Sequence, residues 1–380
     1  MIRVLLAGAT GSVGRSTLEV VRALAPDARL LGVFSGANAA ALAPIAREFG
    51  VRYAGVSDAR ALPALRAALP DARTGAGDDF LAEAVADPEI DIVVNAVSGA
   101  AGLTASLEAA RRGKTLALAN KESLVMAGPV LLRAAASSGA RVVPVDSEHS
   151  AIFQVLRAGR RGEVRRVILT ASGGPFRTWS AEAMERATPA DALRHPTWSM
   201  GPKISVDSAT LMNKALELVE ARWLFELDPD QLDVVVHPQS LVHSFVEYVD
   251  GSLVAQMGKP DMRLPIQFAL TWPERRGPGF GSFRVEDFAR LTFEAPDRDR
   301  FPALELGERA ARAGGTAGAV LNAANEVAVR RFLDGEIPFP AIAATVAAVL
   351  EDASIAPDPG LDDVVAADRA AREDAARCRT

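Results

Sequence analysis

Short apolar runs alternate with segments of helical spacing along the first 145 residues of the chain. The runs lie at residues 4–7, 30–34, 90–97, 115–119 and 142–145, and residues 15–24 carry the first helical pattern. Predominantly apolar runs of this length are typical of strands buried on both faces of a parallel sheet. Strands that alternate with helices predict an α/β fold with an N-terminal, Rossmann-like, doubly wound parallel sheet.

A different pattern begins after residue 146. Residues 234–237, 241–249 and 252–257 read as strands, the last two joined by a hairpin at Asp250-Gly251, which predicts a second, mixed sheet. The last ~90 residues read as helices, as in a satellite bundle. We therefore expect a Rossmann-like domain at 1–146, an α+β domain at 147–272, a Pro- and Gly-rich linker at 273–292 and an α-helical domain at 293–380.

Composition narrows the class of protein. A chain of 380 residues with 49% apolar and 24% charged residues should form two or three soluble globular domains. The net charge of −6 argues against nucleic acid or an anionic membrane as the main partner, and no run is long enough to span a bilayer. The first residues enter a strand at once, so we expect no signal peptide. The single cysteine, Cys378, excludes a disulfide framework and favours a reducing cytoplasm.

A glycine-rich turn separates the first strand from the first helix. Gly8, Gly11 and Gly14 give the pattern G-x-x-G-x-x-G in a strand–turn–helix context. Such a turn lets the backbone approach a pyrophosphate, and the helix N-terminus adds amide donors. The alternative is a tight turn with a purely structural role. The context favours a dinucleotide site.

The end of the second predicted strand indicates which dinucleotide binds. An enzyme that uses NAD places Asp or Glu there to bind the ribose hydroxyls. No acidic residue occurs between positions 27 and 48, which favours NADP, although no Lys or Arg occurs between positions 29 and 47 either. Ser35 and Asn38 are the phosphate donors that this segment offers.

Two later strand ends carry ionisable groups. Asp146, Ser147 and Glu148 follow the strand at 142–145; in an extended segment Asp146 and Glu148 would face the same side and could bind Mg²⁺ or Mn²⁺. Taken alone, these residues favour the alternative, an ordinary acidic strand end at which Asp146 caps the next helix. Lys121 follows the strand at 115–119 and is either a proton shuttle, a cation for the substrate, or a solvated loop lysine.

The middle of the chain offers an anion-binding turn and a candidate lid. Ser172-Gly173-Gly174 follows a predicted strand, and its amides form either an anion nest or a simple loop entry. Residues 178–201 are polar, contain two prolines, and carry His195, Trp198 and Met200. This segment is a candidate lid over a site, unless Trp198 and Met200 pack into a core.

A helix is predicted to follow the candidate lid, capped by Asp207 or Ser208 and ending near Phe225. Three of its residues, Asn213, Lys214 and Glu217, share one helical face. They form either a solvated Lys–Glu pair, or an anion-binding group with a third carboxylate for a metal. Two histidines further on, His237 and His243, are expected to be hydrogen-bonded sheet residues rather than metal ligands.

Several longer blocks occur in order and carry a family resemblance: Gly-Ala-Thr-Gly-Ser-Val-Gly, Asn-Lys-Glu-Ser, Val-Asp-Ser-Glu-His, Ala-Ser-Gly-Gly-Pro-Phe, His-Pro-Thr-Trp-Ser-Met-Gly, Lys-Ile-Ser-Val-Asp-Ser-Ala-Thr-Leu-Met-Asn-Lys-Ala-Leu-Glu and His-Pro-Gln-Ser. With them the chain resembles the 1-deoxy-D-xylulose 5-phosphate reductoisomerase family over essentially its whole length. The resemblance implies NADPH- and Mg²⁺- or Mn²⁺-dependent conversion of that sugar phosphate to 2-C-methyl-D-erythritol 4-phosphate, a step of non-mevalonate isoprenoid synthesis. It also implies a homodimer.

The resemblance also implies roles for individual residues. The implied metal ligands are Asp146, Glu148 and Glu217, which with Lys121 and His195 make up the catalytic set. The implied substrate-binding residues are Lys121, Ser147, Glu148, Ser172, His195, Trp198, Ser208, Asn213, Lys214 and Glu217. The implied cofactor-binding residues are Thr10, Gly11, Ser12, Val13, Gly36, Ala37, Asn38, Asn120, Glu122, Met200 and Gly201. Ala37 departs from the family, many members of which carry a basic or polar residue there.

Two other functions fit parts of the sequence. A semialdehyde-type dehydrogenase has a similar glycine turn but attacks its substrate with a cysteine thiolate, and the only cysteine here lies three residues from the end of the sequence. A non-catalytic NADP-binding sensor would need neither three carboxylates nor a phosphate clamp. Both therefore explain less of the sequence than the resemblance does.

Overall fold

The computed structural model describes residues 1–198, 200–277, 279–281 and 283–378. The chain divides into two compact units, each built from several segments. Unit 1 comprises Met1–Ser123, Leu131–Ser150 and Asp261–Ser282; unit 2 comprises Leu124–Val130, Ala151–Pro260 and Phe283–Thr380. The predicted lid, linker and C-terminal ranges include residues 199, 278, 282 and 379–380, which lie outside the described residues. No described helix is long and apolar enough to cross a membrane.

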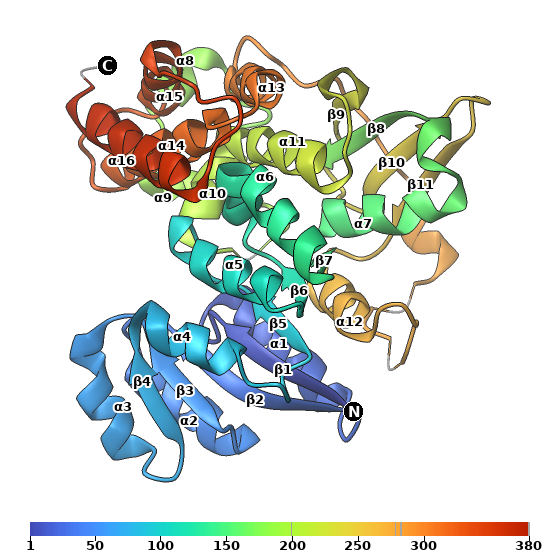
Figure 1. The fold of residues 1–380 in the computed structure, drawn as a ribbon. Coiled ribbons are helices and arrows are strands. Elements are labelled where there is room, and N and C mark those ends of the chain that lie inside the picture. The colour runs from blue at the N-terminus through green and yellow to red at the C-terminus, as the bar shows by residue number, and fades with distance from the viewer. Residues whose placement is uncertain (199, 278, 282, 379–380) are drawn as a thin grey trace. The chain divides into compact units, whose positions relative to one another are not determined.

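Unit 1 is built on a seven-stranded parallel sheet in the order β4-β3-β2-β1-β5-β6-β7 (Figure 1). The strands are β1 Ile2–Ala7, β2 Ala28–Ser35, β3 Tyr53–Val56, β4 Arg73–Ala76, β5 Ile92–Asn95, β6 Thr115–Leu118 and β7 Arg141–Pro144. All four residues of β5 are buried, as a strand covered on both faces requires. The strand order reverses between β1 and β5, which places a ligand-binding crevice at the carboxyl ends of these two strands. The predicted doubly wound sheet is confirmed.

Helices cover this sheet. They are α1 Ser12–Ala23, α2 Ala39–Phe49, α3 Leu62–Ala68, α4 Gly77–Val85, α5 Leu103–Arg111 and α12 Arg263–Thr271. In Figure 1, α12 packs beside α1 although the two are far apart in sequence. Arg263 fixes this packing, because it forms ion pairs with Asp261 at 2.7 Å and with Glu19 of α1 at 3.0 Å. Residues 261–282 are thus an integral part of unit 1.

Unit 2 contains the second sheet, in the order β11-β10-β8-β9. Its strands are β8 Val164–Ala171, β9 Leu232–Val236, β10 Val242–Tyr248 and β11 Leu253–Met257. The β8–β9 pair is parallel, whereas β10 pairs antiparallel with both β8 and β11. The predicted mixed sheet and its hairpin are therefore confirmed.

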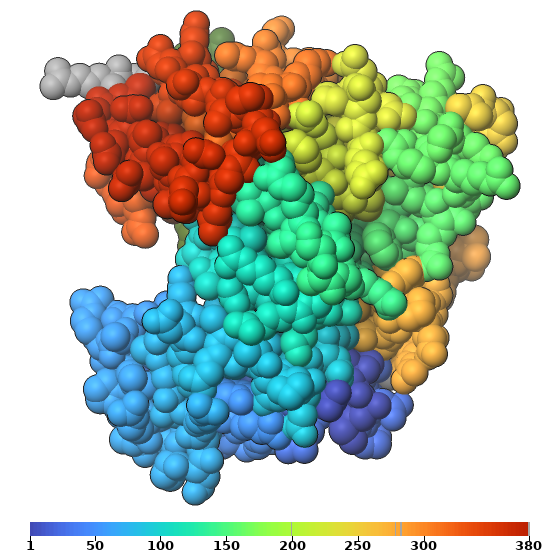
Figure 2. Space-filling view, in the orientation of Figure 1, coloured from blue at the N-terminus to red at the C-terminus, as the bar shows by residue number. Residues whose placement is uncertain are grey.

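Helices make up the rest of unit 2. They are α8 Ala181–Glu185, α9 Pro189–Ala192, α10 Pro202–Ala209, α11 Met212–Leu224, α13 Ala303–Ala313, α14 Ala317–Leu333, α15 Ala341–Asp352 and α16 Leu361–Arg377. The atoms of α14, α15 and α16 form one continuous surface in Figure 2, and their apolar faces share a core with α11. Residues 303–377 form these last four helices and the loops between them, in agreement with the predicted helical C-terminal region.

Two helices have residues in both units. Helix α6, Lys121–Ser138, is kinked at Ala127, two residues before Pro129. Proline cannot donate the backbone hydrogen bond that the preceding turn needs, which accounts for the kink. Helix α7, Ser147–Val155, likewise begins in unit 1 and ends in unit 2. The predicted boundaries at 146, 272 and 292 remain predictions; in the division by contacts, 261–282 group with the parallel sheet and the C-terminal helices with the mixed sheet.

Candidate functional site

The glycine turn has the geometry of a pyrophosphate cradle. Gly8 has φ = +86°, and a Cβ on it would collide with the carbonyl of Ala96. The amides of Gly8 and Ala9 both donate to the carbonyl of Phe34 at 2.9 Å, which fixes the turn against the end of β2. Among the described residues no side chain caps α1 at Gly11, so its first amides remain available to an anion. The cradle fits a dinucleotide.

The loop after β2 is exposed at the three residues predicted to bind the cofactor. Gly36, Ala37 and Asn38 are exposed, whereas Ser35 is 7% exposed with its hydroxyl buried. The expectation that Ser35 offers a phosphate donor therefore does not fit this structure. Asn38 caps α2, since its Oδ1 accepts the amide of Ala41 at 2.9 Å. Its side-chain N–H groups are left for a ligand.

Asn120 is buried and holds the loop after β5. Its Nδ2 donates to the carbonyls of Val97 and Gly99 and to Oε2 of Glu122, each at 2.9 Å. Its Oδ1 caps α6 by accepting the amide of Ser123 at 3.1 Å. In this structure Asn120 and Glu122 shape the carboxyl edge of the sheet through internal hydrogen bonds.

The segment after β7 is helical rather than extended. Helix α7 begins at Ser147, directly after Asp146. The Asp146 carbonyl accepts the amide of Ser150 at 2.8 Å, and its Oδ1 lies 3.4 Å from the amide nitrogen of Glu148. The prediction that Asp146 and Glu148 share one side of an extended strand was therefore wrong. The capping alternative describes the local geometry, and it leaves the second carboxylate oxygen of Asp146 for another partner.

That partner is Lys121. Its Nζ lies 2.5 Å from Oδ2 of Asp146, and the Lys121 side chain is only 6% exposed. Burial raises the pKa of Asp146, but the charge of Lys121 and the hydrogen bond and charge of His149 outweigh burial, so this pKa lies well below its usual range. Asp146 is therefore ionised at neutral pH. Because the Lys121 side chain is buried in this ion pair, the alternative of a solvated loop lysine is excluded.

His149 is a site residue that the sequence analysis did not single out. Its Nδ1 lies 3.8 Å from Oδ1 of Asp146, and it is fully buried. Asp146 and His149 are three residues apart, so a helical interpretation of the segment would have placed them on one face. Two predicted site residues, Ser147 and Glu148, lie in the first turn of α7. The Ser147 hydroxyl donates to Oε2 of Glu148.

In unit 2 the Ser-Gly-Gly turn lies against the end of α10. Gly173 and Gly174 have φ values of +84° and +67°, and a Cβ on Gly174 would collide with the carbonyl of Ser208. The amide of Gly174 donates to the Ser172 hydroxyl at 3.3 Å. Two predicted phosphate-binding segments, the turn at Ser172 and the helix end at Ser208, are thus neighbours, as a shared phosphate site requires.

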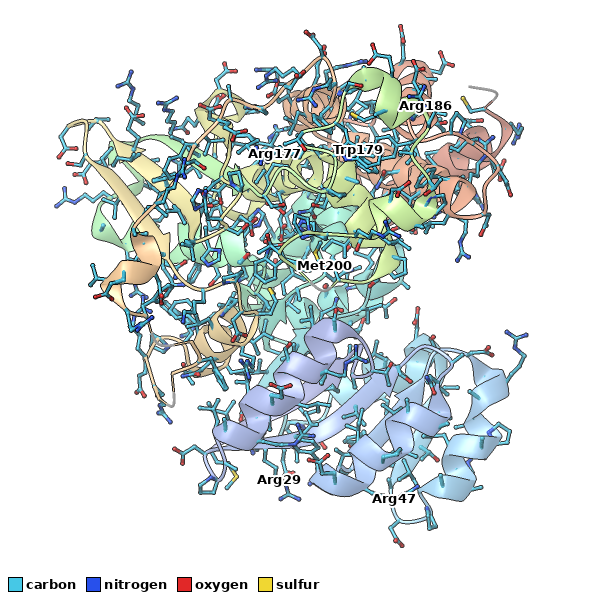
Figure 3. The ribbon with its side chains drawn as sticks, turned by 180° about the vertical axis from the view of Figure 1, so that it is seen from behind. Arg29, Arg47, Arg177, Trp179, Arg186 and Met200 are labelled. Atoms are coloured by element: carbon cyan, nitrogen blue, oxygen red, sulfur yellow. The ribbon has the colours of Figure 1, made fainter. Side chains whose placement is uncertain are left out.

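The candidate lid, residues 178–201, contains α8 and α9 and connects to this turn through His195. The ring Nδ1 of His195 accepts the amides of Thr197 and Trp198 at 3.1 and 2.9 Å, so it carries no proton. The proton is therefore on Nε2, which lies 2.9 Å from the Ser172 hydroxyl and donates to it. Trp198, Met200 and Gly201 are partly buried on the same segment, which Figure 3 shows at the Met200 label.

Burial lowers the pKa of His195 from 6.5 to about 4. Because the unfolded chain takes up this proton near 6.5, the contribution of His195 to stability is complete above that pH and declines as the pH falls towards about 4. We expect a histidine NMR signal that is absent from His195→Asn and titrates near pH 4. A midpoint near the ordinary value would contradict the neutral, latched imidazole.

The helix predicted from Asp207 or Ser208 to Phe225 is two helices. Asp207 and Ser208 lie in the last turn of α10, and α11 begins at Met212. Leu211 separates them with φ = +59°, a left-handed conformation that leucine rarely adopts. Asp207 and Ser208 therefore lie within the first helix and do not cap the second, so this capping prediction was wrong.

The first turns of α11 carry the predicted ion-pair face. Asn213 Nδ2 donates to Oε1 of Glu217 at 2.6 Å, and Lys214 Nζ pairs with Oε2 of Glu217. The Lys214 and Glu217 side chains are 3% and 1% exposed. This pair is buried, so the alternative of a solvated surface pair is excluded.

The two sheet histidines have structural partners. His237 is fully buried; its Nδ1 lies 2.9 Å from the carbonyl of Thr292, its Nε2 accepts the amide of Leu241 at 3.2 Å, and its ring stacks on Phe293 at 4.6 Å. His243 is 7% exposed in β10. His237 follows β9 directly and is hydrogen-bonded, so the expectation of a hydrogen-bonded histidine is confirmed, although the strand ends one residue earlier.

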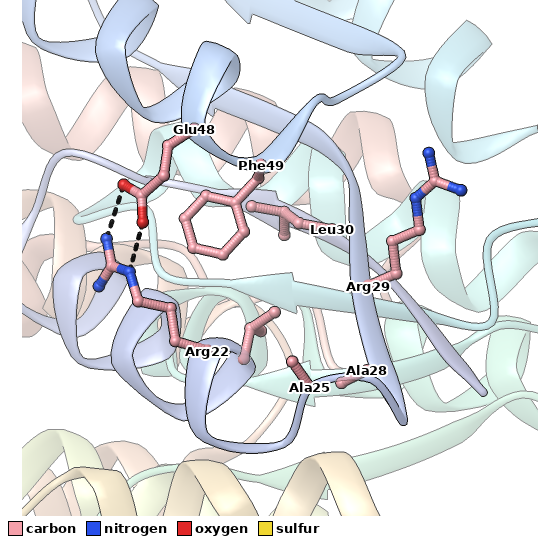
Figure 4. A pocket seen from close by; sticks show the side chains of 8 residues that line it. Arg22, Ala25, Ala28, Arg29, Leu30, Glu48 and Phe49 are labelled. Carbon is pink, nitrogen blue, oxygen red and sulfur yellow. Dashed lines mark hydrogen bonds and ion pairs between the residues drawn. The ribbon is translucent and has the colours of Figure 1, made fainter.

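A cavity of about 340 Å³ lies at the opposite, amino edge of the parallel sheet (Figure 4). Apolar residues of α1, β2 and α2 line it, and one side is closed by Arg22, which donates to both oxygens of Glu48 at 2.5 and 2.8 Å. Ligands of open α/β sheets bind at the carboxyl edge, so this cavity is separate from the candidate site.

Family models match three parts of the chain. The model described as 1-deoxy-D-xylulose 5-phosphate reductoisomerase matches residues 4–128, its C-terminal domain matches 142–225, and the DXP reductoisomerase C-terminal domain matches 257–374. A curated 1-deoxy-D-xylulose 5-phosphate reductoisomerase of Rhodopseudomonas palustris (strain HaA2) is 50% identical over 97% of this chain and 92% of its own length. That of Pelotomaculum thermopropionicum is 49% identical over 98% and 97%.

This chain belongs to the 1-deoxy-D-xylulose 5-phosphate reductoisomerase family.

Solved structures of the family agree with the fold. The enzyme from Zymomonas mobilis in complex with NADPH aligns with a TM-score of 0.91 and 45% identity over 99% of this chain and 98% of that one. A DOX-P reductoisomerase in complex with NADPH, fosmidomycin and magnesium aligns with a TM-score of 0.94 and 40% identity over 99% and 97%. The predicted family and the predicted three-part fold class are therefore confirmed.

Proposed function

We propose that this reductoisomerase-family chain converts 1-deoxy-D-xylulose 5-phosphate to 2-C-methyl-D-erythritol 4-phosphate with NADPH and Mg²⁺ or Mn²⁺, a step of non-mevalonate isoprenoid synthesis. The observation that carries the proposal is identity of about half over nearly the full length of curated reductoisomerases. Structures of this family with NADPH and with magnesium support the cofactor and the metal.

We propose Asp146, Glu148 and Glu217 as the metal ligands. Three carboxylates suit a hard divalent cation, and the charge of Lys121 keeps Asp146 ionised and ready to coordinate. When bound, the ion would act as a Lewis acid on the substrate carbonyl and the adjacent hydroxyl.

The substrate phosphate is proposed to bind in unit 2. The amides of the Gly173-Gly174 turn and the hydroxyls of Ser172 and Ser208 provide neutral donors, and the turn lies against the end of α10. Lys214 and Asn213 add a cation and an amide at the start of α11. Binding energy at the phosphate would fix the position of the reacting carbons.

Lys121 and His195 are proposed to move and orient protons. The Lys121 ammonium, already 2.5 Å from Asp146, can donate a hydrogen bond to an oxygen that gains negative charge as the carbon skeleton rearranges. The neutral His195 ring donates a hydrogen bond from Nε2–H to Ser172. The same N–H group can instead donate to a substrate oxygen. Ser147, beside Glu148, would contact the reacting carbons, and Trp198 would cover the site and exclude water.

The cofactor is proposed to lie along the carboxyl edge of the parallel sheet. The cradle at Thr10, Gly11, Ser12 and Val13 would hold the pyrophosphate, and residues 36–38 the adenosine ribose. Asn120 and Glu122 shape the same edge, and Met200 and Gly201 are proposed to contact the nicotinamide. Bound there, NADPH supplies the hydride that reduces the rearranged aldehyde.

Loss of NADPH absorbance is the direct test. We expect it when 1-deoxy-D-xylulose 5-phosphate is added to the purified protein with Mg²⁺, and we expect a chelator to stop it. Absence of NADPH oxidation under these conditions would refute the proposed reaction. Oxidation that persists with chelator would refute the metal requirement alone.

Two other functions would give different results in this assay. A dehydrogenase with a cysteine nucleophile would lose activity in Cys378→Ser. Cys378 is the residue that directly follows α16. A non-catalytic sensor would bind NADPH without oxidising it.

We also propose a cytoplasmic homodimer. Strand β11 is an edge of the mixed sheet, and its Leu253 and Met257 are 53% and 38% exposed. An open edge strand with exposed apolar residues can pair with a second copy of the chain. Light scattering should give twice the 40.0 kDa mass of the chain; a monomer mass would refute the dimer. A free cysteine suits a reducing compartment.

A further inference from the structure

The 2′-phosphate of NADPH needs a partner that the loop after β2 does not contain. An NADP enzyme commonly places an arginine near this phosphate, whereas here the exposed residues are Gly36, Ala37 and Asn38. The nearest basic residues along the chain are Arg29, at the start of β2, and Arg47, in the last turn of α2. Both lie at the amino edge of the sheet, as the labels in Figure 3 show, and the cofactor binds at the other edge.

The loop after β3 lies directly against the loop after β2. The amide of Ser57 lies 2.9 Å from the carbonyls of both Ser35 and Gly36, and the amide of Asp58 donates to the Gly36 carbonyl at 3.2 Å. A Cβ on Gly36 would lie 3.9 Å from the Ser57 hydroxyl. Side chains of this second loop can therefore reach a phosphate held at residues 36–38.

This second loop carries an arginine. The Arg60 side chain is 92% exposed, and its Nε and Nη2 donate to the carboxylate of Asp58 at 2.8 to 3.1 Å. The pair holds the guanidinium against Asp58, the residue whose amide donates to the Gly36 carbonyl, and its bonds use Nε and Nη2 rather than Nη1. A guanidinium has enough donors to bind a carboxylate and a phosphate at once.

We propose that Arg60 supplies the cation that binds the 2′-phosphate of NADPH, with the Asn38 amide and the Ser57 hydroxyl as its neutral partners. In this chain the cation thus comes from the β3–α3 loop, which compensates for Ala37. The inference deepens the proposed function, since it assumes that the chain uses NADPH.

Arg15, near the start of α1, is an alternative source of charge, but its contact points to a different part of the cofactor. Its Nη1 donates to the carbonyl of Thr10 at 3.1 Å, within the glycine turn. A charge held there acts on the pyrophosphate, which NADPH and NADH share. Arg15→Ala should therefore weaken both cofactors by the same factor.

Calorimetric titration of the full chain with NADPH and with NADH separates these roles without relying on turnover. We expect Arg60→Ala to weaken NADPH about tenfold at low salt while changing NADH less than about twofold, because only NADPH has the 2′-phosphate. Arg60→Lys should retain part of the preference, and raised salt should reduce it in the unchanged protein but not in Arg60→Ala.

Arg66→Ala is the matched control, because it removes an exposed arginine of α3, a few residues along the chain, and should leave both affinities unchanged. Equal NADPH-to-NADH ratios in the unchanged protein and Arg60→Ala would overturn the inference, as would a selective loss in Arg15→Ala. In either case NADPH oxidation with 1-deoxy-D-xylulose 5-phosphate would still support the proposed function. A protein that binds no NADPH at all would refute both.

Discussion

Glu217→Gln should abolish metal-dependent turnover and leave NADPH binding close to that of the unchanged protein. Glu217 is fully buried, and it is the proposed third metal ligand, supplied by unit 2. Glutamine keeps the size of the side chain but removes the charge that a hard cation requires. Lewis-acid stabilisation is worth several kcal/mol, and each 1.36 kcal/mol is tenfold in rate, so we expect kcat to fall about a thousandfold.

The control for this variant is Glu220→Gln. Glu220 is also fully buried on α11, three residues further on, but belongs to no proposed ligand set. Mn²⁺ titration followed by electron paramagnetic resonance should show weakened metal binding in Glu217→Gln alone. Equal losses of activity in the two variants would mean that a buried charge, rather than a metal ligand, had been removed. Loss of NADPH binding in Glu217→Gln would also count against its assigned role.

Much of the fold can be predicted from patterns of residues that are close in sequence. Five of the seven strands of the parallel sheet, β1, β2, β5, β6 and β7, coincide with apolar runs, whereas β3 and β4 were not predicted. The glycine turn is defined by three residues within seven. The β10–β11 hairpin was visible because Asp250-Gly251 separates two apolar segments. Each of these features depends on residues that are close in sequence, which is why the sequence alone sufficed.

Features that depend on distant contacts could not be predicted in this way. Helix α12 packs on α1 through the Arg263–Glu19 pair, which joins residues 244 positions apart. Leu211 takes a left-handed conformation that nothing in its residue type signals, so one long helix was predicted where there are two. The burial of the Lys214–Glu217 pair is likewise set by packing, since the same spacing on an exposed helix would be solvated.

The candidate site shows the same division at Asp146. The sequence shows that the ionisable residues follow a strand. It does not show whether they continue in an extended segment or begin a helix, because Asp is common at both positions. The helix that forms places His149 beside Asp146, and the distant Lys121 determines the charge state of that carboxylate. Residue identities were therefore predictable, whereas their partners were not.

Lys214→Met should destabilise unit 2 by about 3–5 kcal/mol, the usual cost of leaving one member of a buried ion pair without its partner. Lys214 and Glu217 pair with side chains only 3% and 1% exposed, so water cannot replace the lost ammonium. Urea unfolding with a chelator present, which keeps metal from compensating the charge, should show the full loss.

A double variant separates the charge from the packing. Lys214→Met combined with Glu217→Gln removes the stranded carboxylate as well, and should recover most of the stability lost in Lys214→Met alone. Because Asn213 still donates to the side chain at position 217, the glutamine keeps a partner. A double variant no more stable than Lys214→Met would mean that lost packing of the lysine stem, rather than the uncompensated charge, causes the loss.

The same pair of variants connects stability to the proposed metal. If Glu217 is a metal ligand, replacing the chelator with excess Mn²⁺ should raise the urea midpoint of Lys214→Met, because the cation neutralises the stranded carboxylate and binds only the folded protein. The double variant lacks that carboxylate and should respond much less. An equal response of both variants to Mn²⁺ would place the cation elsewhere and remove Glu217 from the ligand set.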